Sequence, residues 1–250
     1  MVLNLYKYNV MEQEDYSKIY EYESMGKEYV GEKACISLTS WKARINTVSK
    51  TLYSLIKMCP GFHIVLVLSK DEFPLMEKEL PDNLMLFVEN KLIELFWIRP
   101  NLKSFKKVLF TMDKYRDVPV ISADDDCVYI CNYAQILYER WLKNKDCRIS
   151  FEKVKRKFGQ KLLCGYGTIN PPNCFSFLKL KILETLIDMN LNEDDMFYAI
   201  SSDRHDIKMI GLGYKGHEKI CLFHDDISAL SDIRKYNDES DYYKMIKLKF

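Results

Sequence analysis

Apolar and polar positions alternate in blocks along the first half of the chain, and the blocks predict strands separated by helices. Four short apolar runs are typical of buried strands in a parallel sheet. These runs are Ala34 to Leu38, Ile64 to Leu68, Leu84 to Val88 and Val118 to Ile121. Two further segments carry apolar residues at helical spacing, one formed by Val48, Leu52, Leu55 and Ile56, the other by Phe105, Val108, Leu109 and Met112. Strands alternating with helices predict an α/β, Rossmann-like domain with a mainly parallel central sheet.

The pattern is less regular in the second half and at the start of the chain. The expected elements are strands at Cys147 to Val154 and Ile207 to Ile210, a Gly- and Pro-containing loop at Gly165 to Asn173, a helix with Ile182, Leu183, Leu186 and Ile187 inward, and a helix opening at Asn192. Residues 1–33 are rich in Tyr and Glu without a clear period, which predicts an N-terminal appendage. Residues 34–250 contain no convincing linker and are expected to form one domain.

Composition narrows the classes of partner. Apolar residues make up 48% of the chain, and 37 basic side chains balance 36 acidic ones, which argues against a nucleic-acid binder. No apolar run reaches the roughly 18 residues that a transmembrane helix needs, and charged residues interrupt the opening segment where a signal peptide would lie. We therefore expect a soluble, cytoplasmic protein. The mixed aromatic and basic ending, Tyr242 to Phe250, allows peripheral contact with the inner membrane, the alternative being a helix docked on the domain.

Eight cysteines are present, but none forms a Cys-x-x-Cys pair. Several of them, such as Cys35 and Cys164, lie among apolar neighbours. The expectation is reduced, mostly buried thiols that pack as small hydrophobic side chains, and not a zinc site.

The most informative polar feature is the triplet Asp124, Asp125 and Asp126, which follows the apolar run ending at Ile121. Adjacent carboxylates repel by up to about 4 kcal/mol per pair at an effective dielectric of 20 and a separation of about 4 Å, so a compensating cation is expected. Carboxylate oxygen ligands favour Mg²⁺ or Mn²⁺. The alternative is an acidic turn that faces solvent. The preceding strand favours a ligand site, because α/β proteins hold ligands at strand ends.

Five segments in order resemble bacterial glycosyltransferases of the A-type (GT-A) fold, of the family 2 kind. They are Ile36–Ile45 (ISLTSWKARI), Ser104–Val108 (SFKKV), Ile121–Tyr129 (ISADDDCVY), Asn170–Pro172 (NPP) and Glu193–Phe197 (EDDMF). The resemblance implies a single nucleotide-diphospho-sugar transferase domain. Residues 34–130 would form its nucleotide-sugar-binding half and residues 131–250 its acceptor side.

By this resemblance, Asp124 and Asp126 contact the metal or the ribose, with Asp125 beside them at the sugar donor. Glu193 to Asp195 is similar to the acidic motif that supplies the catalytic base of inverting enzymes; Asp195 is favoured for that role, with Asp194 next to it. Acidic residues also stabilise a helix start without any catalytic reason, and this alternative stays open.

The resemblance assigns further contacts to the nucleotide sugar. Thr39, Ser40 and Arg44 would line the nucleotide pocket, the alternative being a loop that merely caps the next helix. Lys106 or Lys107 would face the sugar donor, the alternative being a solvated helix face. His224 is a candidate late metal ligand, although a lone histidine is more often structural.

The function expected from these features is transfer of a sugar, with inversion, from a UDP-linked nucleotide sugar to a hydroxyl of a bacterial surface glycan, assisted by Mn²⁺ or Mg²⁺. One rival is a metal-dependent nucleotidyltransferase, but the segment Thr39 to Ile45 lacks the glycines of a phosphate loop. The other is a noncatalytic module that binds a glycan or a protein on the same fold.

Overall fold

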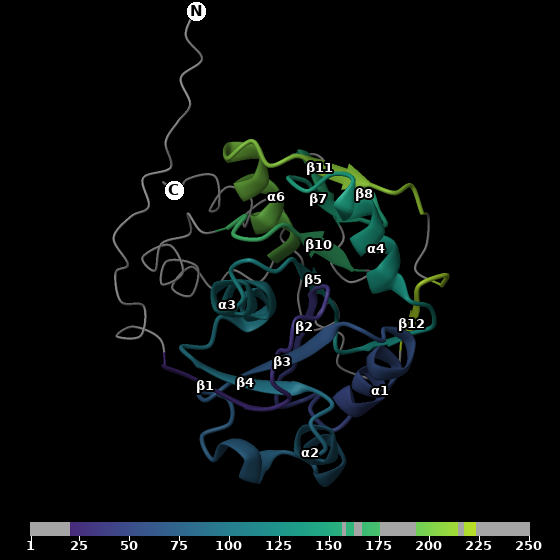
Figure 1. Cartoon of the computed structure of the whole chain (residues 1–250). Coiled ribbons are helices and arrows are strands. Elements are labelled where there is room, and N and C mark those ends of the chain that lie inside the picture. Colours follow the sequence, from purple (N-terminus) through teal and green to yellow (C-terminus); the bar gives the residue numbers. More distant parts are fainter. Residues whose placement is uncertain (1–20, 157–158, 163–166, 176–193, 215–217, 224–250) are drawn as a thin grey trace, which may run out of the picture.

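The computed structural model describes residues 21–156, 159–162, 167–175, 194–214 and 218–223 of the chain (Figure 1). An eight-stranded sheet forms its centre, with the strand order β1-β4-β3-β2-β5-β10-β7-β11. Its strands are β1 (Glu21–Gly26), β2 (Cys35–Thr39), β3 (His63–Ser69), β4 (Glu94–Arg99), β5 (Val120–Ser122), β7 (Arg148–Ser150), β10 (Thr168–Asn170) and β11 (Met209–Gly211).

Smaller elements surround this sheet. Strand β6 (Cys127–Tyr129) pairs with β12 (Cys221–Phe223), and β8 (Lys153–Arg156) pairs with β9 (Gly159–Leu162). The helices are α1 (Val48–Met58), α2 (Asp82–Glu89), α3 (Lys106–Lys114), α4 (Tyr133–Leu142) and α6 (Asp194–Arg204), with 3₁₀ turns η2 (Met76–Glu79) and η3 (Lys103–Phe105). In the described parts of the chain, no helix has the length and apolar character required to cross a membrane.

The middle of the sheet is parallel. Strand β2 pairs in parallel with both β3 and β5, and β3 pairs in parallel with β4. Antiparallel neighbours flank this core, β1 beside β4 and β10 beside β5. The predicted α/β class with a mainly parallel central sheet is confirmed.

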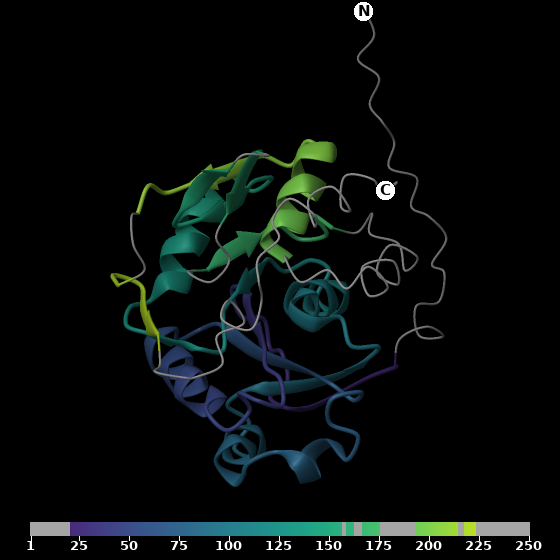
Figure 2. The ribbon, with the colours of Figure 1, turned by 180° about the vertical axis from the view of Figure 1, so that it is seen from behind.

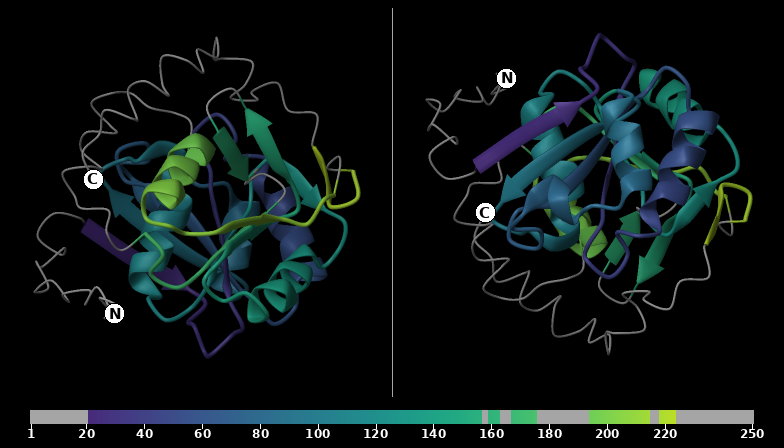
Figure 3. Two further views of the ribbon diagram at one scale, coloured as in Figure 1. Left: turned by 90° about the horizontal axis from the view of Figure 1, so that it is seen from above. Right: turned by 90° about the horizontal axis from the view of Figure 1, so that it is seen from below.

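Both faces of the parallel core are covered, which explains its continuous apolar runs. In β3, Ile64, Leu66 and Leu68 pack in the cluster that contains α1, α2 and α4, whereas Val65 and Val67 pack in the cluster that contains α3 and α6. Figures 1 and 2 show α1 and α2 on one side of the strands and α3 on the other. Seen from above, α6 lies in front of the sheet, and from below α1 and α2 do (Figure 3). A strand buried on both faces carries no polar alternation.

The strand order contains a reversal that bears on function. From β2 the chain adds β3 and then β4 on one side, and afterwards places β5 on the other side of β2. Such a reversal leaves a crevice outside the carboxyl ends of the two strands where it occurs, and α/β proteins bind ligands there. In this chain that position lies between the ends of β2 and β5.

One predicted strand is wrong. Leu84 to Val88 lies in helix α2, and the third parallel strand is β4, a little further along the chain. Leu84 and Val88 are buried at 0% and 1% exposure, while Leu86 between them is 56% exposed. A strand would place these three side chains on one face, whereas a helix separates Leu86 from the other two. The run contains only one β-branched residue, and a short apolar run cannot by itself separate the two periods.

The second half also differs from the prediction. The loop expected at Gly165 to Asn173 contains the fully buried strand β10. Gly167 before it has φ 94°, and a Cβ there would lie 2.5 Å from the ring of Tyr133, so its lack of a side chain serves packing. The strand expected at Cys147 to Val154 is two strands, β7 and β8, in different sheets. The strand expected at Ile207 to Ile210 is confirmed as β11, shifted slightly.

Other predictions concern the ends of the chain and the segment between β10 and α6. Strand β1 lies within the expected N-terminal appendage and pairs antiparallel with β4, so this part extends the central sheet. Three predictions lie outside the described residues: the helix around Ile182 to Ile187, the start of the next helix at Asn192, and the chain ending Tyr242 to Phe250. The expected burial of thiols is confirmed for most described cysteines, namely Cys35, Cys59, Cys127, Cys147 and Cys221.

A buried polar network joins the amino-terminal ends of β3 and β4. Glu94 is 2% exposed, lies 2.7 Å from Nε2 of His63, accepts a 2.5 Å hydrogen bond from the Tyr115 hydroxyl, and pairs with Lys114. Burial alone would raise the pKa of Glu94, but the hydrogen bonds with His63, Lys114 and Tyr115 outweigh it and lower the pKa to about 2. The network therefore stabilises the fold through an ionised carboxylate.

Glu94→Gln is expected to lower the free energy of unfolding by about 2 kcal/mol at pH 7, since it weakens hydrogen bonds to a buried charge. The folded-state pKa of Glu94, about 2, lies below its ordinary value of 4.5. Its contribution is therefore present above about pH 4.5 and is lost as the pH falls toward 2. Urea unfolding between pH 7 and pH 2.5 should show the difference between wild type and variant shrinking with acid. Glu89→Gln, at an exposed position of α2, is the control, and a pH-independent difference for Glu94→Gln would contradict the prediction.

Candidate active site

The aspartate triplet lies in the turn between β5 and β6, at the carboxyl end of β5. This is the end of the sheet where the strand order reverses beside β2. The loop that follows β2 reaches the same place, because Ser40 and Arg44 both contact the triplet. The tertiary structure thus brings two of the predicted segments together in the ligand-binding crevice of the fold class.

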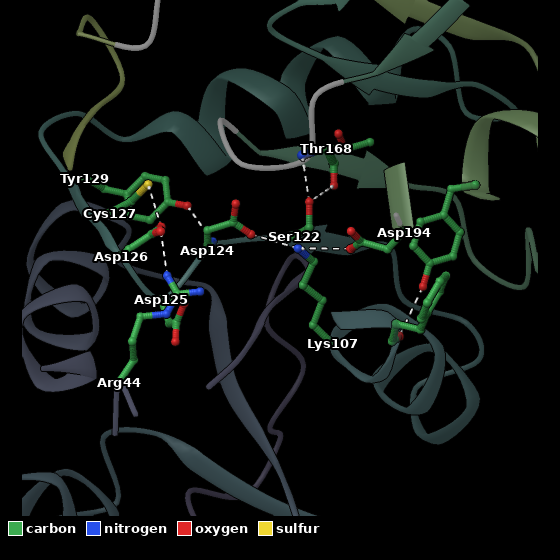
Figure 4. A network of polar contacts seen from close by, with 12 residues as sticks. Arg44, Lys107, Ser122, Asp124, Asp125, Asp126, Cys127, Tyr129, Thr168 and Asp194 are labelled. Carbon is green, nitrogen blue, oxygen red and sulfur yellow. Dashed lines mark hydrogen bonds and ion pairs between the residues drawn. The ribbon is translucent and has the colours of Figure 1, made fainter. Parts of the chain in front are cut away.

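The three carboxylates, drawn as sticks in Figure 4, differ in their exposed fractions. Asp125 is only 4% exposed, whereas the side chains of Asp124 and Asp126 are 33% and 24% exposed. The alternative of an acidic turn that simply faces solvent is therefore wrong for Asp125. The turn directs one carboxylate into the protein and leaves two within reach of a ligand.

Asp125 is anchored from several directions. The Ser40 hydroxyl donates a 2.6 Å hydrogen bond to Oδ2 of Asp125, and Nη1 of Arg44 lies 3.1 Å from Oδ1. The Thr51 hydroxyl on α1 donates to the backbone carbonyl of Asp125 at 2.8 Å. Burial raises the pKa of Asp125 to about 6, although Arg44 and Ser40 act to lower it. These contacts hold the turn in one conformation.

Arg44 links the second and third aspartates. Its Nη1 lies 3.1 Å from Asp125 and 2.5 Å from Oδ2 of Asp126, and its side chain is only 6% exposed. The expected role of Arg44 at the nucleotide is not visible in these contacts, since the guanidinium is engaged by the triplet. Its buried position makes it a counter-ion for the turn.

The other two predicted residues of this loop have different partners. Thr39 donates a 2.7 Å hydrogen bond to the carbonyl of Val67 on β3, while Ser40 holds Asp125. The alternative that these residues cap helix α1 is wrong, because the residue before α1 is Thr47, which donates to the carbonyl of Arg44.

Lys107 joins the triplet to the second acidic motif. Its Nζ lies 2.7 Å from Oδ1 of Asp124 and 3.2 Å from Oδ2 of Asp194 (Figure 4). The contact brings the first turn of α6 to the carboxyl end of β5, although the two are distant in the sequence. Two acidic segments that lie far apart in the sequence therefore contact the same ammonium group.

Lys106 contacts Glu72 and Asn101, and not the triplet. It is 2% exposed, lies 3.1 Å from Oε2 of Glu72, and donates to Oδ1 of Asn101 at 3.1 Å. Burial lowers the pKa of Lys106, and Glu72 opposes that effect. Since Lys107 is also buried, at 5% exposure, the alternative of a solvated helix face is wrong for both lysines.

Helix α6 packs closely on α3 and η3. The hydroxyl of Tyr198 donates a 3.1 Å hydrogen bond to the carbonyl of Phe105, and the rings of Phe105 and Phe197 meet edge to face at 5.3 Å. Asp194 and Asp195 lie in the first turn of α6, where negative charge stabilises a helix, so this alternative role holds for both. Asp195 is partly exposed. Glu193 and the candidate ligand His224 lie outside the described residues.

Sequence reasoning missed the residues that support the turn from below. The backbone N–H of Asp124 donates to the hydroxyl of Tyr129 at 3.0 Å, and the N–H of Tyr129 donates to the Ser54 hydroxyl at 3.0 Å. The Tyr129 ring stacks on Tyr133, with centroids 4.3 Å apart. The available signal was an aromatic residue with a hydroxyl inside an apolar strand, because a buried tyrosine hydroxyl requires a hydrogen-bond partner.

The residues of the turn suit a divalent ion that brings other ligands with it. Asp124 and Asp126 offer partly exposed oxygen ligands, and Mg²⁺ commonly takes one or two protein carboxylates together with water and substrate phosphates. Within the described ranges, no group of three or more His, Cys, Asp or Glu residues forms a metal site by itself. The partly exposed carboxylates of Asp124 and Asp126 are the ligand type that Mg²⁺ or Mn²⁺ takes together with a phosphate.

Comparison of the sequence with family models and with curated proteins finds no match. Among solved structures, the chain is similar to a mannosyltransferase, PcManGT from Pyrobaculum calidifontis in complex with GDP-Man and Mn²⁺, at a TM-score of 0.46 and 12% identity over 80% of this chain and 59% of that one. It is also similar to the apo form of the glycosyltransferase GlyE of Streptococcus pneumoniae TIGR4, at a TM-score of 0.41 and 13% identity over 72% of this chain and 45% of that one.

A second structure of GlyE aligns equally, at a TM-score of 0.41 and 12% identity over 72% of this chain and 46% of that one. The chain thus spans about half the length of the solved structures it matches. Likenesses with TM-scores below 0.5 do not establish a shared activity.

Truncation of Asp125 is expected to lower the free energy of unfolding more than truncation of Asp124. Asp125→Ala leaves the buried Arg44 short of one partner and should lower the free energy of unfolding by about 3–5 kcal/mol. Asp124→Ala removes a partly exposed carboxylate and leaves the buried Lys107 paired with Asp194, so it should cost less, about 1–2 kcal/mol. Urea unfolding followed by circular dichroism measures both, and equal losses would contradict the distinction between an anchoring and a ligand-facing carboxylate.

Proposed function

We propose that this chain is a metal-dependent glycosyltransferase of the GT-A type, which moves a sugar from a UDP-linked sugar donor to a hydroxyl of a bacterial surface glycan with inversion. The observation that carries the proposal is the bridge formed by Lys107 between Asp124 and Asp194. It joins a candidate ion-binding carboxylate to the helix turn that holds the candidate base Asp195. An inverting transfer requires those two groups on either side of one anomeric carbon.

The region outside the carboxyl ends of β2 and β5 is the proposed site of the nucleotide diphosphate. The loop from Thr39 to Arg44 is proposed to border the nucleotide, with Ser40 and Arg44 acting through Asp125 and Asp126, which they hold. Within the part of the chain that the structure describes, Nε1 of Trp41 and Nε of Arg44 are buried without a hydrogen-bond partner. Such donors are rare in folded proteins, and both lie in the loop that is proposed to border the nucleotide.

The local charge supports a need for a divalent ion. Among the described residues, Asp124, Asp125, Asp126 and Asp194 pair with two cations, Arg44 and Lys107, which leaves two formal negative charges in this group. A diphosphate alone would be repelled by this group. Bound Mg²⁺ or Mn²⁺, held by Asp124 and Asp126 with His224 as a further candidate, would neutralise the charge that develops on the leaving nucleoside diphosphate.

Asp195 is proposed as the general base and Asp194 as its neighbour that fixes the helix turn. Asp194 is engaged by Lys107 and is 14% exposed at its side chain. A carboxylate in the first turn of a helix is stabilised in its ionised form, which is the form that accepts a proton from the acceptor hydroxyl.

The two rivals differ from this proposal in what they would do with a nucleotide. A nucleotidyltransferase would release pyrophosphate from a nucleoside triphosphate, whereas a glycosyltransferase releases a nucleoside diphosphate from a nucleotide sugar. A noncatalytic module would show no turnover of either compound. Product analysis with UTP plus a sugar 1-phosphate as the attacking group, and with UDP-sugars, each with Mn²⁺, therefore separates all three.

Asp126→Ala is expected to abolish Mn²⁺-dependent hydrolysis of a UDP-sugar, because the ion loses one of its two proposed protein carboxylates. Release of UDP, followed by chromatography with and without chelator, gives the measurement. A melting temperature close to that of the wild type shows that the fold is intact. Unchanged turnover in a folded Asp126→Ala protein would contradict the metal role.

Asp195→Asn is expected to lower the rate of sugar transfer or hydrolysis by about 10²–10⁴-fold, the usual contribution of a general base, while the affinity for UDP with Mn²⁺ stays within about twofold. Nuclear magnetic resonance of the first product from an α-linked donor should show the β-anomer. A retained α-anomer would contradict inversion, and a fully active Asp195→Asn protein would contradict the assigned base.

A further inference from the structure

We infer that Lys107 is a resident counter-cation that competes with a divalent ion for Asp124. This inference rests on the proposed function, since it takes Asp124 as one of the ion's ligands. It adds a property that the sequence does not reveal, namely that the protein carries its own cation at the place where the ion would bind.

The position of the ammonium supports this inference. Nζ of Lys107 lies 2.7 Å from Oδ1 of Asp124, close enough for a charge-assisted hydrogen bond. The Lys107 side chain is 6% exposed, whereas that of Asp124 is 33% exposed. The lysine thus contacts Asp124 from the protein interior, while another part of the carboxylate stays open to solvent, from which an ion would arrive.

A second partner makes an exchange feasible. Nζ of Lys107 is also 3.2 Å from Oδ2 of Asp194 on α6. A buried ammonium without any counter-charge is strongly destabilising. When Asp124 binds a divalent ion instead of Lys107, Asp194 remains as the counter-charge of the lysine.

The other cation of the site differs in this respect. Arg44 is bound to Asp125, whose carboxylate is buried at 4% exposure, and its contact stabilises the turn itself. Lys107 instead contacts the most exposed member of the triplet. The two cations therefore have separate roles, Arg44 in building the turn and Lys107 in setting how strongly the turn attracts an ion.

Removal of the Lys107 charge should raise the affinity of the site for a divalent ion. An ammonium a few ångströms from a divalent ion repels it, and removal of that charge should tighten ion binding by roughly tenfold even with the high screening of a solvent-exposed site. A lysine that served only the fold or only the nucleotide would not change binding of the ion alone in this direction.

The experiment is titration of Mn²⁺ alone, without nucleotide, followed by the electron paramagnetic resonance signal of the free ion. Lys107→Met and Lys107→Gln are expected to bind Mn²⁺ roughly tenfold more tightly than the wild type. Two variants are used because loss of the Asp194 contact could prevent one of them from folding, which circular dichroism checks. Lys114→Met is the matched control, since Lys114 lies on the same helix and pairs with Glu94 at the far end of the strands, and its Mn²⁺ affinity should equal that of the wild type.

The outcomes separate the inference from the function on which it rests. Equal or weaker Mn²⁺ binding by a folded Lys107 variant, with clear binding by the wild type, overturns the competition and leaves the metal site standing. Absence of Mn²⁺ binding in the wild type and in both Lys107 variants overturns the metal site and, with it, the competition.

Discussion

The rest of the site depends on the neutralisation of three adjacent carboxylates at the end of β5. Their mutual repulsion is up to about 4 kcal/mol per pair at an effective dielectric of 20 and about 4 Å. The protein offsets much of it with two buried cations, Arg44 from the loop after β2 and Lys107 from α3. Because each cation comes from a different element, the electrostatic requirement of the turn also fixes the position of that loop and that helix. Asp194 extends the same network to α6.

Further contacts at the carboxyl ends of the inner strands β2 and β5 support this network. The strand order reverses between β2 and β5, and hydrogen bonds from Thr51 to Asp125 and from Asp124 to Tyr129 hold the turn beside this reversal. At the opposite end of the strands, Glu94 is held by His63, Lys114 and Tyr115. Helix α3 contributes to the network around the aspartate triplet and to the network around Glu94, since Lys107 lies in its first turn and Lys114 is its last residue. A turn held in this way needs little reorganisation when a charge is placed beside it.

The local pattern of apolar residues was sufficient to predict a strand or helix where its spacing matched one element type and the element is buried. The strands near Ala34 to Leu38 and Ile64 to Leu68, and the helix containing Phe105 to Met112, follow directly from apolar spacing. It failed at α2, where a run of five apolar residues suits either period, and at β10, where a three-residue buried strand follows a glycine. Strand β4 was missed because charged residues, Glu94 and Arg99, stand at both of its ends. Glu94 is tolerated there only through partners distant in the sequence.

The sequence by itself determined the fold class and the chemistry on offer: an alternating α/β pattern, a carboxylate triplet after a strand, an acidic helix start and adjacent lysines, because these follow from residue type and short-range spacing. Only the tertiary structure decided which carboxylate is buried, that Lys106 and Lys107 take different partners, and that Asp124 and Asp194 meet at one ammonium. The physical reason is that ion pairing and burial depend on distances between segments, and those distances are set by strand order and helix packing, which no local pattern encodes.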